Sequence, residues 1–296
     1  MTMAKPRIGW IGLGKMGIPV CGHVRQAGYG VTAYVRNGAG REKASKLGLE
    51  QADSLAGLAA ASDIIISSIS DDAALSDIVS GVTGLAACMK AGQVLIETST
   101  VSPAASAQAA ALLDGKGVAY LRSPVSGSTA TAEARQLTVL VSGPKAQFDS
   151  ALPLFETFSR KQYYLGDSEQ ARYLKIALNA MVGAMSALLA EALTLGRRGG
   201  LDTTAMLDII NNSAVASPLI GYKTKMLIAE DFTPAFTVAG MMKDLDIALA
   251  IGRSEHIPLP LTAHIRQQYE AAHAGGSGGD DFFVLVREHA RLAGFK

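Results

Sequence analysis

Residues 7–17 read RIGWIGLGKMG, a short β-branched run that leads into three glycines with the spacing G-x-G-x-x-G. In a strand–turn–helix unit, Gly12 would allow the tight turn, Gly14 the close approach of a pyrophosphate, and Gly17 close packing of the helix. The free amides at the start of that helix would face the anion. The glycines could instead serve only a tight turn, but here they follow a predicted strand and open a predicted helix. The stretch therefore predicts a dinucleotide site formed by Gly12, Leu13, Gly14, Lys15, Met16 and Gly17.

The first half of the chain continues this alternation of short strands and alanine-rich helical stretches. Such alternation is typical of an α/β domain with a parallel sheet and crossover helices, here a Rossmann-type doubly wound sheet. The predicted strands are residues 7–11, 31–35, 63–69, 94–97, 118–121 and 137–143, with a further strand near 162–165.

The second half of the chain has a different texture. Residues 168–198 contain no proline, and a helix of that length would extend roughly 45 Å. The remaining predicted helices are residues 203–213, 218–228, 239–253, 260–274 and 281–293. We therefore expect two domains: a dinucleotide-binding domain at 1–167 and an all-α domain at 168–296, joined by the long helix.

The end of the second strand bears on the choice between NAD and NADP. An acidic residue there would bind the ribose 2′-hydroxyl, whereas an arginine suits a 2′-phosphate. The chain has Arg36 and Asn37 at this point, then Arg41 and Lys43, and its first carboxylate is Glu42. The sequence favours NADP, although NAD is possible and Arg36 could be an ordinary solvated side chain.

The long helix carries one polar stripe in an otherwise apolar surround. Lys175, Asn179, Gly183 and Ser186 fall within roughly 80° of one another at 100° per residue. Apolar residues on nearly every other side predict a helix buried between other elements. A buried lysine is costly unless it is paired or its pKa falls, so Lys175 is a candidate proton donor for hydride transfer to a carbonyl. The alternative is that Lys175 extends along the helix surface into water.

Composition excludes several classes of protein. With 27 basic and 26 acidic residues among 296, the net charge of +1 gives no basic surface for nucleic acid. Two cysteines and five histidines without ligand spacing predict neither a disulfide framework nor a metal site. We also find no run of roughly 18 uninterrupted apolar residues and no convincing signal peptide. A cytoplasmic protein is expected, without nucleic-acid or membrane partners.

With these residues in view, nearly the whole chain resembles the β-hydroxyacid dehydrogenase family. Four motifs carry the resemblance: GLGKMG at 12–17; RSPVSGS at 122–128, where the family usually has D-x-P-V-S-G-G; KIALN at 175–179, where it has K-x-x-N-N; and Lys243-Asp244. The family includes 3-hydroxyisobutyrate dehydrogenases and tartronate semialdehyde reductases. It implies a hydroxy acid or semialdehyde as substrate and assembly into a homodimer or homotetramer.

The resemblance also implies roles for individual residues. Lys175 would be the general acid/base, with Asn179 as a substrate ligand. Ser126 and Gly127, with Ser128 in the same loop, would bind the substrate carboxylate. The residues expected beside the nicotinamide or bordering the cofactor are Ile69, Ser70, Thr100 and Lys243. Read without the family, Lys243 would more often be a solvated helix charge.

The departures from the family pattern are at Arg122, Ser128 and Arg135, where the family commonly has Asp, Gly and Gly, and at Leu178, where it has Asn. We expect the first three to set this protein's own substrate preference. Two alternatives stay open: an imine or other carbonyl reductase, against which Lys175 argues, and a non-catalytic NADP-binding module, which would not need that lysine.

Overall fold

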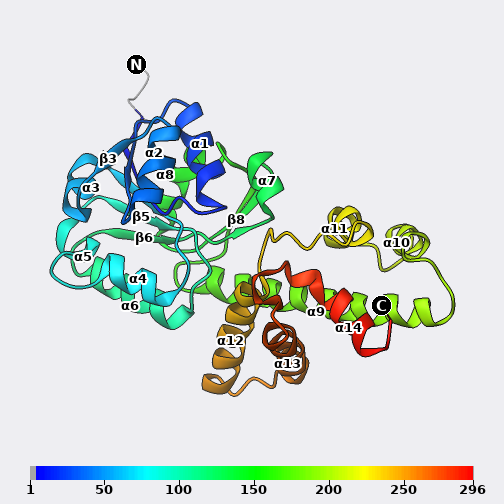
Figure 1. Cartoon of the computed structure of the whole chain (residues 1–296). Coiled ribbons are helices and arrows are strands. Elements are labelled where there is room, and N and C mark those ends of the chain that lie inside the picture. The colour runs from blue at the N-terminus through cyan, green and yellow to red at the C-terminus, as the bar shows by residue number, and fades with distance from the viewer. Residues whose placement is uncertain (1–4, 296) are drawn as a thin grey trace. The chain divides into compact units, whose positions relative to one another are not determined.

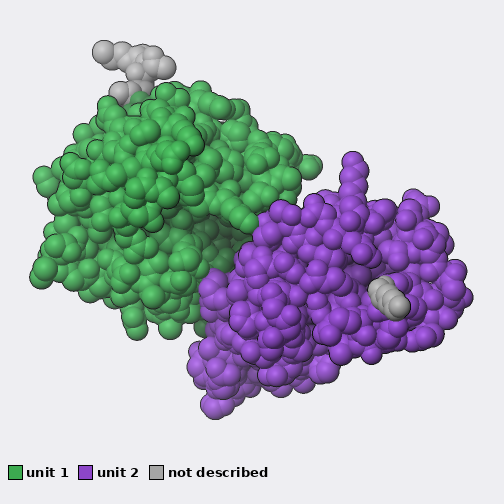
Figure 2. All heavy atoms as spheres, viewed as in Figure 1, with its two compact units in different colours: residues 1–175 green, residues 176–296 purple. Residues whose placement is uncertain are grey.

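A computed structural model describes residues 5–295 of the chain. The chain forms two compact units, one ending at Lys175 and the other beginning at Ile176 (Figure 2). This division falls within helix α9 (Gln170–Arg198), whereas the predicted boundary, after residue 167, precedes that helix. The outermost residues of the predicted domains, 1–4 and 296, lie outside the described part of the chain.

The first unit contains a six-stranded parallel sheet with the order β3-β2-β1-β4-β5-β6 (Figure 1). Its strands are β1 (Ile8–Ile11), β2 (Val31–Tyr34), β3 (Glu50–Ala52), β4 (Ile64–Ser67), β5 (Val94–Glu97) and β6 (Ala119–Arg122). The order reverses direction between β1 and β4, as in a doubly wound fold. The prediction of a Rossmann-type sheet followed by a helical region is therefore confirmed.

Both faces of this sheet are covered, which explains its continuous apolar strands. Neighbouring residues of β4 enter different clusters: Ile65 packs with Leu75 and Leu113, and Ile66 packs with Val24 and Phe155. The helices of the unit are α1 (Gly17–Gln26), α2 (Gly38–Lys46), α3 (Leu55–Ala61), α4 (Asp72–Val79), α5 (Leu85–Cys88), α6 (Pro103–Asp114), α7 (Thr129–Glu133) and α8 (Lys145–Phe155).

A second, smaller sheet follows in the same unit, where the sequence predicted one continuous sheet. It has the order β7-β8-β9, with β7 (Val125–Ser126), β8 (Leu137–Val141) and β9 (Ser159–Tyr164). Strand β7 is antiparallel to β8, and β9 is parallel to it. Two backbone hydrogen bonds of 2.9 Å between Arg122 and Ser142 join it to the end of β6. Strands β3 and β7 are too short to give an alternating pattern, so the sequence did not predict them.

The second unit is helical, as predicted. Besides α9 it contains α10 (Thr203–Asn211), α11 (Pro218–Ile228), α12 (Val238–Ser254), α13 (Pro260–Ala274), two 3₁₀ turns η1 (Ser277–Gly279) and η2 (Phe282–Val284), and α14 (Leu285–Leu292). The side chains of Asp202, Ser217 and Thr237 cap α10, α11 and α12. The single helix expected over 281–293 is divided, because the Asp281 carboxylate accepts a hydrogen bond from the Phe283 amide and caps the 3₁₀ turn.

Helix α9 differs from the expectation of complete burial. Two residues of its polar stripe face the inside of the second unit: the Ser186 hydroxyl donates to the Phe282 carbonyl, and a Cβ at Gly183 would lie 3.0 Å from the Met241 Sδ. On another face Met181, Leu188 and Leu195, each seven residues after the last, are 63%, 68% and 76% exposed. By length and composition the helix could cross a membrane, although the core helix of a soluble protein satisfies the same criteria.

Candidate functional site

The three glycines of the loop between β1 and α1 have three different surroundings. Gly12 has a φ of +96°, and a Cβ there would lie 1.9 Å from the Ser68 carbonyl oxygen. A Cβ at Gly17 would lie 2.1 Å from the Gly12 carbonyl oxygen, so α1 packs directly on the loop. A Cβ at Gly14 would meet no atom within 4 Å. The loop is therefore tightly constrained at its two ends and open at its middle, which is the geometry that a pyrophosphate requires.

A pocket of about 240 Å³ lies beside this loop. Among the residues lining it are Gly12, Leu13, Arg36, Asn37, Lys43 and Ile69. Residues predicted from three separate segments of the sequence thus line one cavity at the carboxyl ends of β1, β2 and β4. Open parallel sheets bind ligands at this edge, where the strand order reverses.

The polar residues after β2 supply positive charge to the pocket. The Asn37 side chain accepts from the Gly40 amide and caps α2. Arg36 lies 3.4 Å from Asp77 in an exposed pair, which holds it only weakly. The Lys43 ammonium donates to the Leu13 carbonyl at 3.3 Å and so bridges α2 and the glycine loop. Lys43 was absent from the predicted site residues, although it belongs to the group of basic residues after the second strand that favoured NADP.

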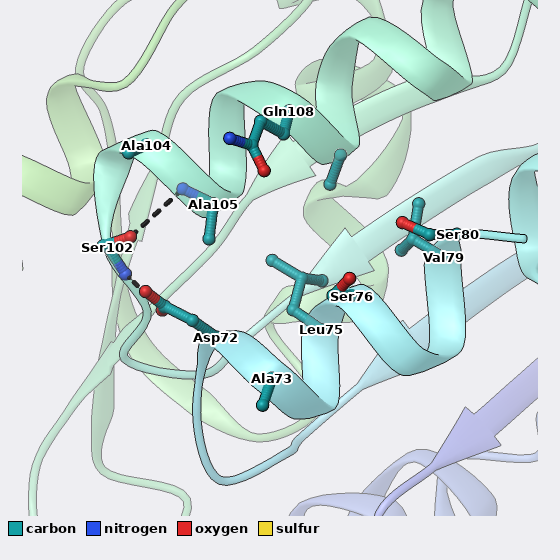
Figure 3. A pocket seen from close by; sticks show the side chains of 11 residues that line it. Asp72, Ala73, Leu75, Ser76, Val79, Ser80, Ser102, Ala104, Ala105 and Gln108 are labelled. Atoms are coloured by element: carbon teal, nitrogen blue, oxygen red, sulfur yellow. Dashed lines mark hydrogen bonds between the residues drawn. The ribbon is translucent and has the colours of Figure 1, made fainter.

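The loops that follow β4 and β5 are tied to each other. The Ile69 amide donates to the Ser99 hydroxyl at 2.7 Å, and the Ser102 amide donates to Asp72 at 2.8 Å. Ser70 and Thr100 therefore lie on loops with fixed backbones. Figure 3 shows a larger pocket, of about 380 Å³, between α4 and α6. None of the predicted site residues lines it, so we do not place the chemistry there.

The loop SPVSGST owes its small residues to crowding against α7. Gly127 has a φ of +145°, and a Cβ there would lie 2.4 Å from the Thr131 Oγ1. The Ser128 hydroxyl accepts from the Thr131 amide, and the Thr131 hydroxyl in turn accepts from the Ser128 amide at 2.7 Å. This reciprocal capping box fixes the backbone just after Ser126, which is half-buried at the end of β7.

The structure gives Arg122 a partner inside the protein. Its guanidinium lies 2.6 Å from the Glu169 carboxylate, and both side chains are nearly buried. The side chain therefore connects the end of β6 to the start of α9, and its part in substrate preference stays a prediction.

Arg135 likewise has a structural role. It has a φ of +59° after the C-terminus of α7, where glycine is favoured. Its Nε donates to His23 Nδ1 at 3.1 Å and its Nη2 to Gln26 at 2.8 Å. Because arginine can only donate, Nδ1 accepts, and the proton on Nε2 faces the Ala132 and Glu133 carbonyls at 3.0 Å. The Arg135 side chain thus joins α7 to α1, although the backbone of this residue has a positive φ that is unfavourable for arginine.

Lys175 lies in the first turns of α9 and is only 8% exposed. The side chain does not extend into water as the alternative required. It belongs to the same unit as the glycine loop and the loop at 123–129. A buried side chain that can hold and release a proton is suited to general acid/base catalysis.

Asn179 and Lys243 meet the same carboxylate in the second unit. Asp244, 2% exposed, accepts from the Asn179 side-chain amide through Oδ2, and the Lys243 ammonium lies 2.9 Å from its Oδ1. Lys243 is therefore paired and not simply a solvated helix charge. Asp244 was visible only as the second residue of the Lys-Asp motif, and its contact with Asn179 arises from tertiary packing.

The first unit thus fits a dinucleotide. The glycine loop and the N-terminus of α1 can receive a pyrophosphate, and the pocket with Arg36, Asn37 and Lys43 can receive a ribose with or without a 2′-phosphate. Such a fold and site define an oxidoreductase that uses a nicotinamide cofactor.

Comparison with known proteins identifies the class more closely. Residues 7–166 match the family model described as the NAD binding domain of 6-phosphogluconate dehydrogenase. Residues 170–288 match the NAD-binding domain of NADP-dependent 3-hydroxyisobutyrate dehydrogenase.

Individual relatives cover nearly the full length. The chain is 33% identical to 2-(hydroxymethyl)glutarate dehydrogenase of Eubacterium barkeri, over 97% of this chain and 96% of that protein. It is 28% identical to glyoxylate/succinic semialdehyde reductase 1 of Arabidopsis thaliana, over 94% and 96%. The crystal structure of 3-hydroxyisobutyrate dehydrogenase from Salmonella typhimurium aligns with a TM-score of 0.85 at 25% identity, over 96% and 99%.

The chain therefore belongs to the β-hydroxyacid dehydrogenase family. It is an NAD(P)-dependent oxidoreductase that acts on CH–OH groups.

Proposed function

We propose that the protein is an NADP-preferring oxidoreductase that interconverts a short 3-hydroxy acid and its semialdehyde, with Lys175 as the general acid/base. The observation that carries this proposal is the burial of Lys175 in the unit that also holds the glycine loop and the small-residue loop at 123–129.

The chemistry assigns one task to each part of the site. The nicotinamide, when bound, accepts or supplies the hydride. In the reductive direction Lys175 donates a proton to the carbonyl oxygen as the alkoxide develops, and in the oxidative direction its neutral amine removes the hydroxyl proton. The Ser126 hydroxyl and the Gly127 amide hold the substrate carboxylate. Asn179, one turn after Lys175 on α9, stays a predicted substrate ligand.

The names of the relatives suggest the first substrates to test. We would assay 2-(hydroxymethyl)glutarate, 3-hydroxyisobutyrate, glyoxylate and succinic semialdehyde with NADP(H) and NAD(H), and add tartronate semialdehyde because of the family resemblance. Activity toward imines or amines alone would favour the imine reductase alternative. Cofactor binding without any turnover would favour the non-catalytic alternative.

Replacing the lysine tests the mechanism. Lys175→Ala is expected to lower kcat by about 10³-fold, within the range for a lost general acid/base, with cofactor Kd changed by no more than about twofold. Lys161→Ala, at an exposed lysine of β9 in the same unit, is the matched control and should retain full turnover. A Lys175→Ala enzyme with near-normal kcat would refute the assignment.

The preference for NADP can be tested at the rim of the pocket. Removing both Arg36 and Lys43 (Arg36→Ser with Lys43→Ser) should lower the ratio of kcat/KM for NADP to that for NAD by about 10- to 100-fold, because a charge-assisted contact contributes about 1.5–3 kcal/mol. Arg41→Ser is the control, since Arg41 lies on α2 in an exposed pair with Asp53, 3.7 Å away. An unchanged ratio would show that Arg36 and Lys43 do not bind the 2′-phosphate of NADP.

We also propose that the protein forms a homodimer or homotetramer in the cytoplasm, with no nucleic-acid or membrane partner. The apolar face of α9 at Met181, Leu188 and Leu195 supports assembly, because three exposed side chains spaced by seven form a helical seam. Leu188→Glu should lower the mass measured by light scattering, whereas Leu261→Glu, on α13 and also exposed, should not. An unchanged mass for Leu188→Glu would exclude this seam.

A further inference from the structure

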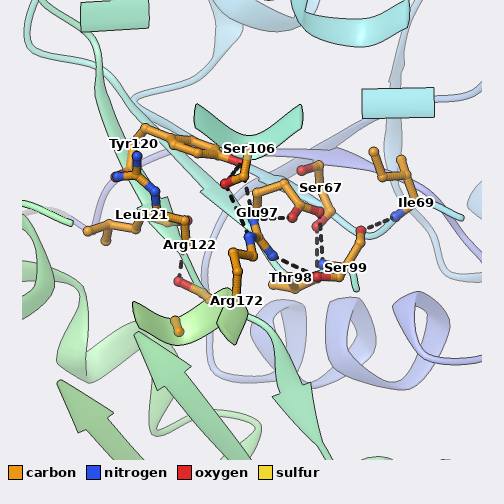
Figure 4. Close-up of polar contacts among 12 residues, drawn as sticks. Ser67, Ile69, Glu97, Thr98, Ser99, Ser106, Tyr120, Leu121, Arg122 and Arg172 are labelled. Carbon is orange, nitrogen blue, oxygen red and sulfur yellow. Dashed lines mark hydrogen bonds and ion pairs between the residues drawn. The ribbon is translucent and has the colours of Figure 1, made fainter. Parts of the chain in front are cut away.

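Four charged side chains meet where helix α9 begins (Figure 4). Glu97 and Arg122 are paired across the sheet at the ends of β5 and β6. Each binds a residue of opposite charge at the start of α9: Glu97 Oε2 lies 2.5 Å from Arg172 Nη2, and Arg122 Nη2 lies 2.6 Å from Glu169 Oε1. Two crossed ion pairs therefore attach the first turn of the helix to two adjacent strands.

The Arg172 guanidinium, which has five N–H donors, makes four hydrogen bonds. The side chain is 1% exposed; its Nε donates to the Ser106 hydroxyl at 3.2 Å, Nη1 to the Ser99 carbonyl at 2.7 Å, and Nη2 to the Tyr120 hydroxyl at 3.1 Å as well as to Glu97. Burial lowers the pKa of Arg172, but the Glu97 carboxylate and Tyr120 raise the pKa by more, so the side chain stays charged.

The aromatic ring of Tyr120 joins the two pairs into one cluster. The Arg122 guanidinium carbon lies 4.8 Å from the centre of that ring, and Arg172 donates a hydrogen bond to the Tyr120 hydroxyl. We call Glu97, Tyr120, Arg122, Glu169 and Arg172 the anchor cluster.

The anchor cluster also contacts the loops that carry predicted site residues. Glu97 Oε1 accepts from the Ser99 amide at 2.8 Å, and the Ser99 hydroxyl accepts from the Ile69 amide. The Glu97 carbonyl accepts from the amide of Ser123, the first residue of SPVSGST, at 2.7 Å. A displacement of Glu97 would therefore also move the loops after β4 and β5 and the loop at 123–129.

Lys175 follows Arg172 by three residues on the same helix. Side chains three apart are neighbours on one helical face, and both are buried here, at 8% and 1% exposure. Fixing Arg172 fixes the rotation and the axial position of this turn. The position of the Lys175 ammonium relative to the strand ends is thereby determined.

Stability alone does not account for such a cluster. Replacing a buried ion pair by apolar residues of similar volume is often neutral or stabilising. The reason is that the free-energy cost of removing the charges from water offsets much of the attraction between them. What the cluster adds is geometric precision, since a guanidinium with four partners admits one orientation.

We propose that Arg172, held by Glu97 and the rest of the anchor cluster, is a positioning residue that sets the place of Lys175 for proton transfer. This inference rests on the proposed function of Lys175.

The decisive variant removes the central pair as a unit. Glu97→Leu with Arg172→Met leaves no unpaired buried charge, so the protein is expected to fold. At saturating cofactor we expect kcat to fall by about 10- to 100-fold and its pH profile to shift, since a misplacement of about 1 Å can cost 10²-fold. Arg172→Lys, which keeps a cation but loses most of the four contacts, should give an intermediate loss.

A second readout does not depend on turnover. The rate at which a small amine-reactive reagent labels Lys175, followed by mass spectrometry, reports the surroundings of that amine and should change by about fivefold or more in the double variant. The matched control is Lys223→Met with Asp281→Leu, which removes an equally buried pair in the second unit and should leave labelling and pH profile unaltered.

The two proposals fail in different ways. Normal Lys175 labelling and a normal pH profile in the Glu97→Leu/Arg172→Met protein would overturn the positioning role. If that protein does not fold, the same result with Arg172→Lys overturns it. Normal turnover by Lys175→Ala would instead overturn the proposed function, while the labelling result would still decide whether the cluster positions the lysine.

Discussion

The two units each contain a buried ion pair of similar length, but the pairs are built differently. Arg172 and Glu97 in the first unit are 1% and 0% exposed, and Lys223 and Asp281 in the second are 4% and 0% exposed at 2.6 Å. Arg172 reaches four partners on strands, loops and a helix, whereas the Lys223 ammonium is held by Asp281 and contacts the Met226 sulfur.

The surroundings of the second pair are those of an architectural contact. Asp281 also accepts from the amides of Ala235 and Phe283, and the rings of Phe282 and Phe283 lie 5.1 and 5.4 Å from the Lys223 ammonium. This pair fastens α11 to the 3₁₀ turn at 282–284, and Asp281 also holds the chain before α12 through the Ala235 amide. The difference teaches that a buried ion pair does not by itself indicate a functional site. The indication comes from whether the residues it contacts lie on loops that carry predicted site residues.

Breaking either pair from one side gives the largest expected effect. Arg172→Met or Lys223→Met leaves a buried carboxylate unpaired and should lower the free energy of unfolding by about 3–5 kcal/mol. Urea denaturation measures the free energy of unfolding. The corresponding double variants should recover most of the lost stability. A loss below about 1 kcal/mol in a single variant would mean that water hydrates the unpaired carboxylate.

Two glycines of one loop provide the next test. Gly12→Ala should lower the free energy of unfolding by about 1–3 kcal/mol, because of its positive φ and the contact with the Ser68 carbonyl. Gly14→Ala should leave unfolding nearly unaltered and weaken cofactor binding, measured by titration. Equal loss of stability in both variants would contradict the separate roles.

A smaller effect is expected at Arg135. Arg135→Gly removes the strain of the positive φ along with the two hydrogen bonds, whereas Arg135→Ala keeps the strain and loses the bonds. The glycine variant should therefore be more stable than the alanine variant by about 1 kcal/mol in thermal unfolding. The reverse order would show that the backbone there is not strained.

The smallest effect is a dependence on alkaline pH. Burial lowers the pKa of Lys223 below its ordinary value of 10.5, and Asp281 offsets this only in part. The unfolded chain then binds more protons just below pH 10.5, so this lysine's contribution to stability rises with pH there. Arg172, whose pKa is raised, contributes no such slope. Unfolding of wild type and Lys223→Met between pH 8.5 and 10.5 compares the slopes, and equal slopes would refute the shift.

Much of the fold follows from local pattern. The strand–glycine–helix order at 7–17 and the continuous apolar run at 64–66 predicted the parallel sheet, because a strand covered on both faces needs apolar residues. The bounds of α11 and α13 were predicted from Pro218 and Pro260, which suit the first turn of a helix. The exposed seam of α9 could not be predicted, since the apolar pattern of a helix is the same whether its own chain or another covers it.

The site was predicted where one segment carries the function and missed where two distant segments meet. The glycine loop and Lys175 stand out in single motifs. The pairing of Arg122 with Glu169 and of Arg172 with Glu97 joins residues 47 and 75 positions apart, and neither pair has a local signature. The motif alone also gave no sign that Arg122 and Arg135 have partners inside the first unit, and their part in substrate preference stays a prediction.

The rate of hydride transfer in a single turnover tests the central claim most directly. With cofactor and substrate both saturating, wild type should show a transfer rate that titrates with one ionisation. Lys175→Gln should transfer hydride about 10³-fold more slowly, with that ionisation lost and cofactor still bound. A variant that transfers hydride at the wild-type rate with the same pH dependence would show that another group carries the proton.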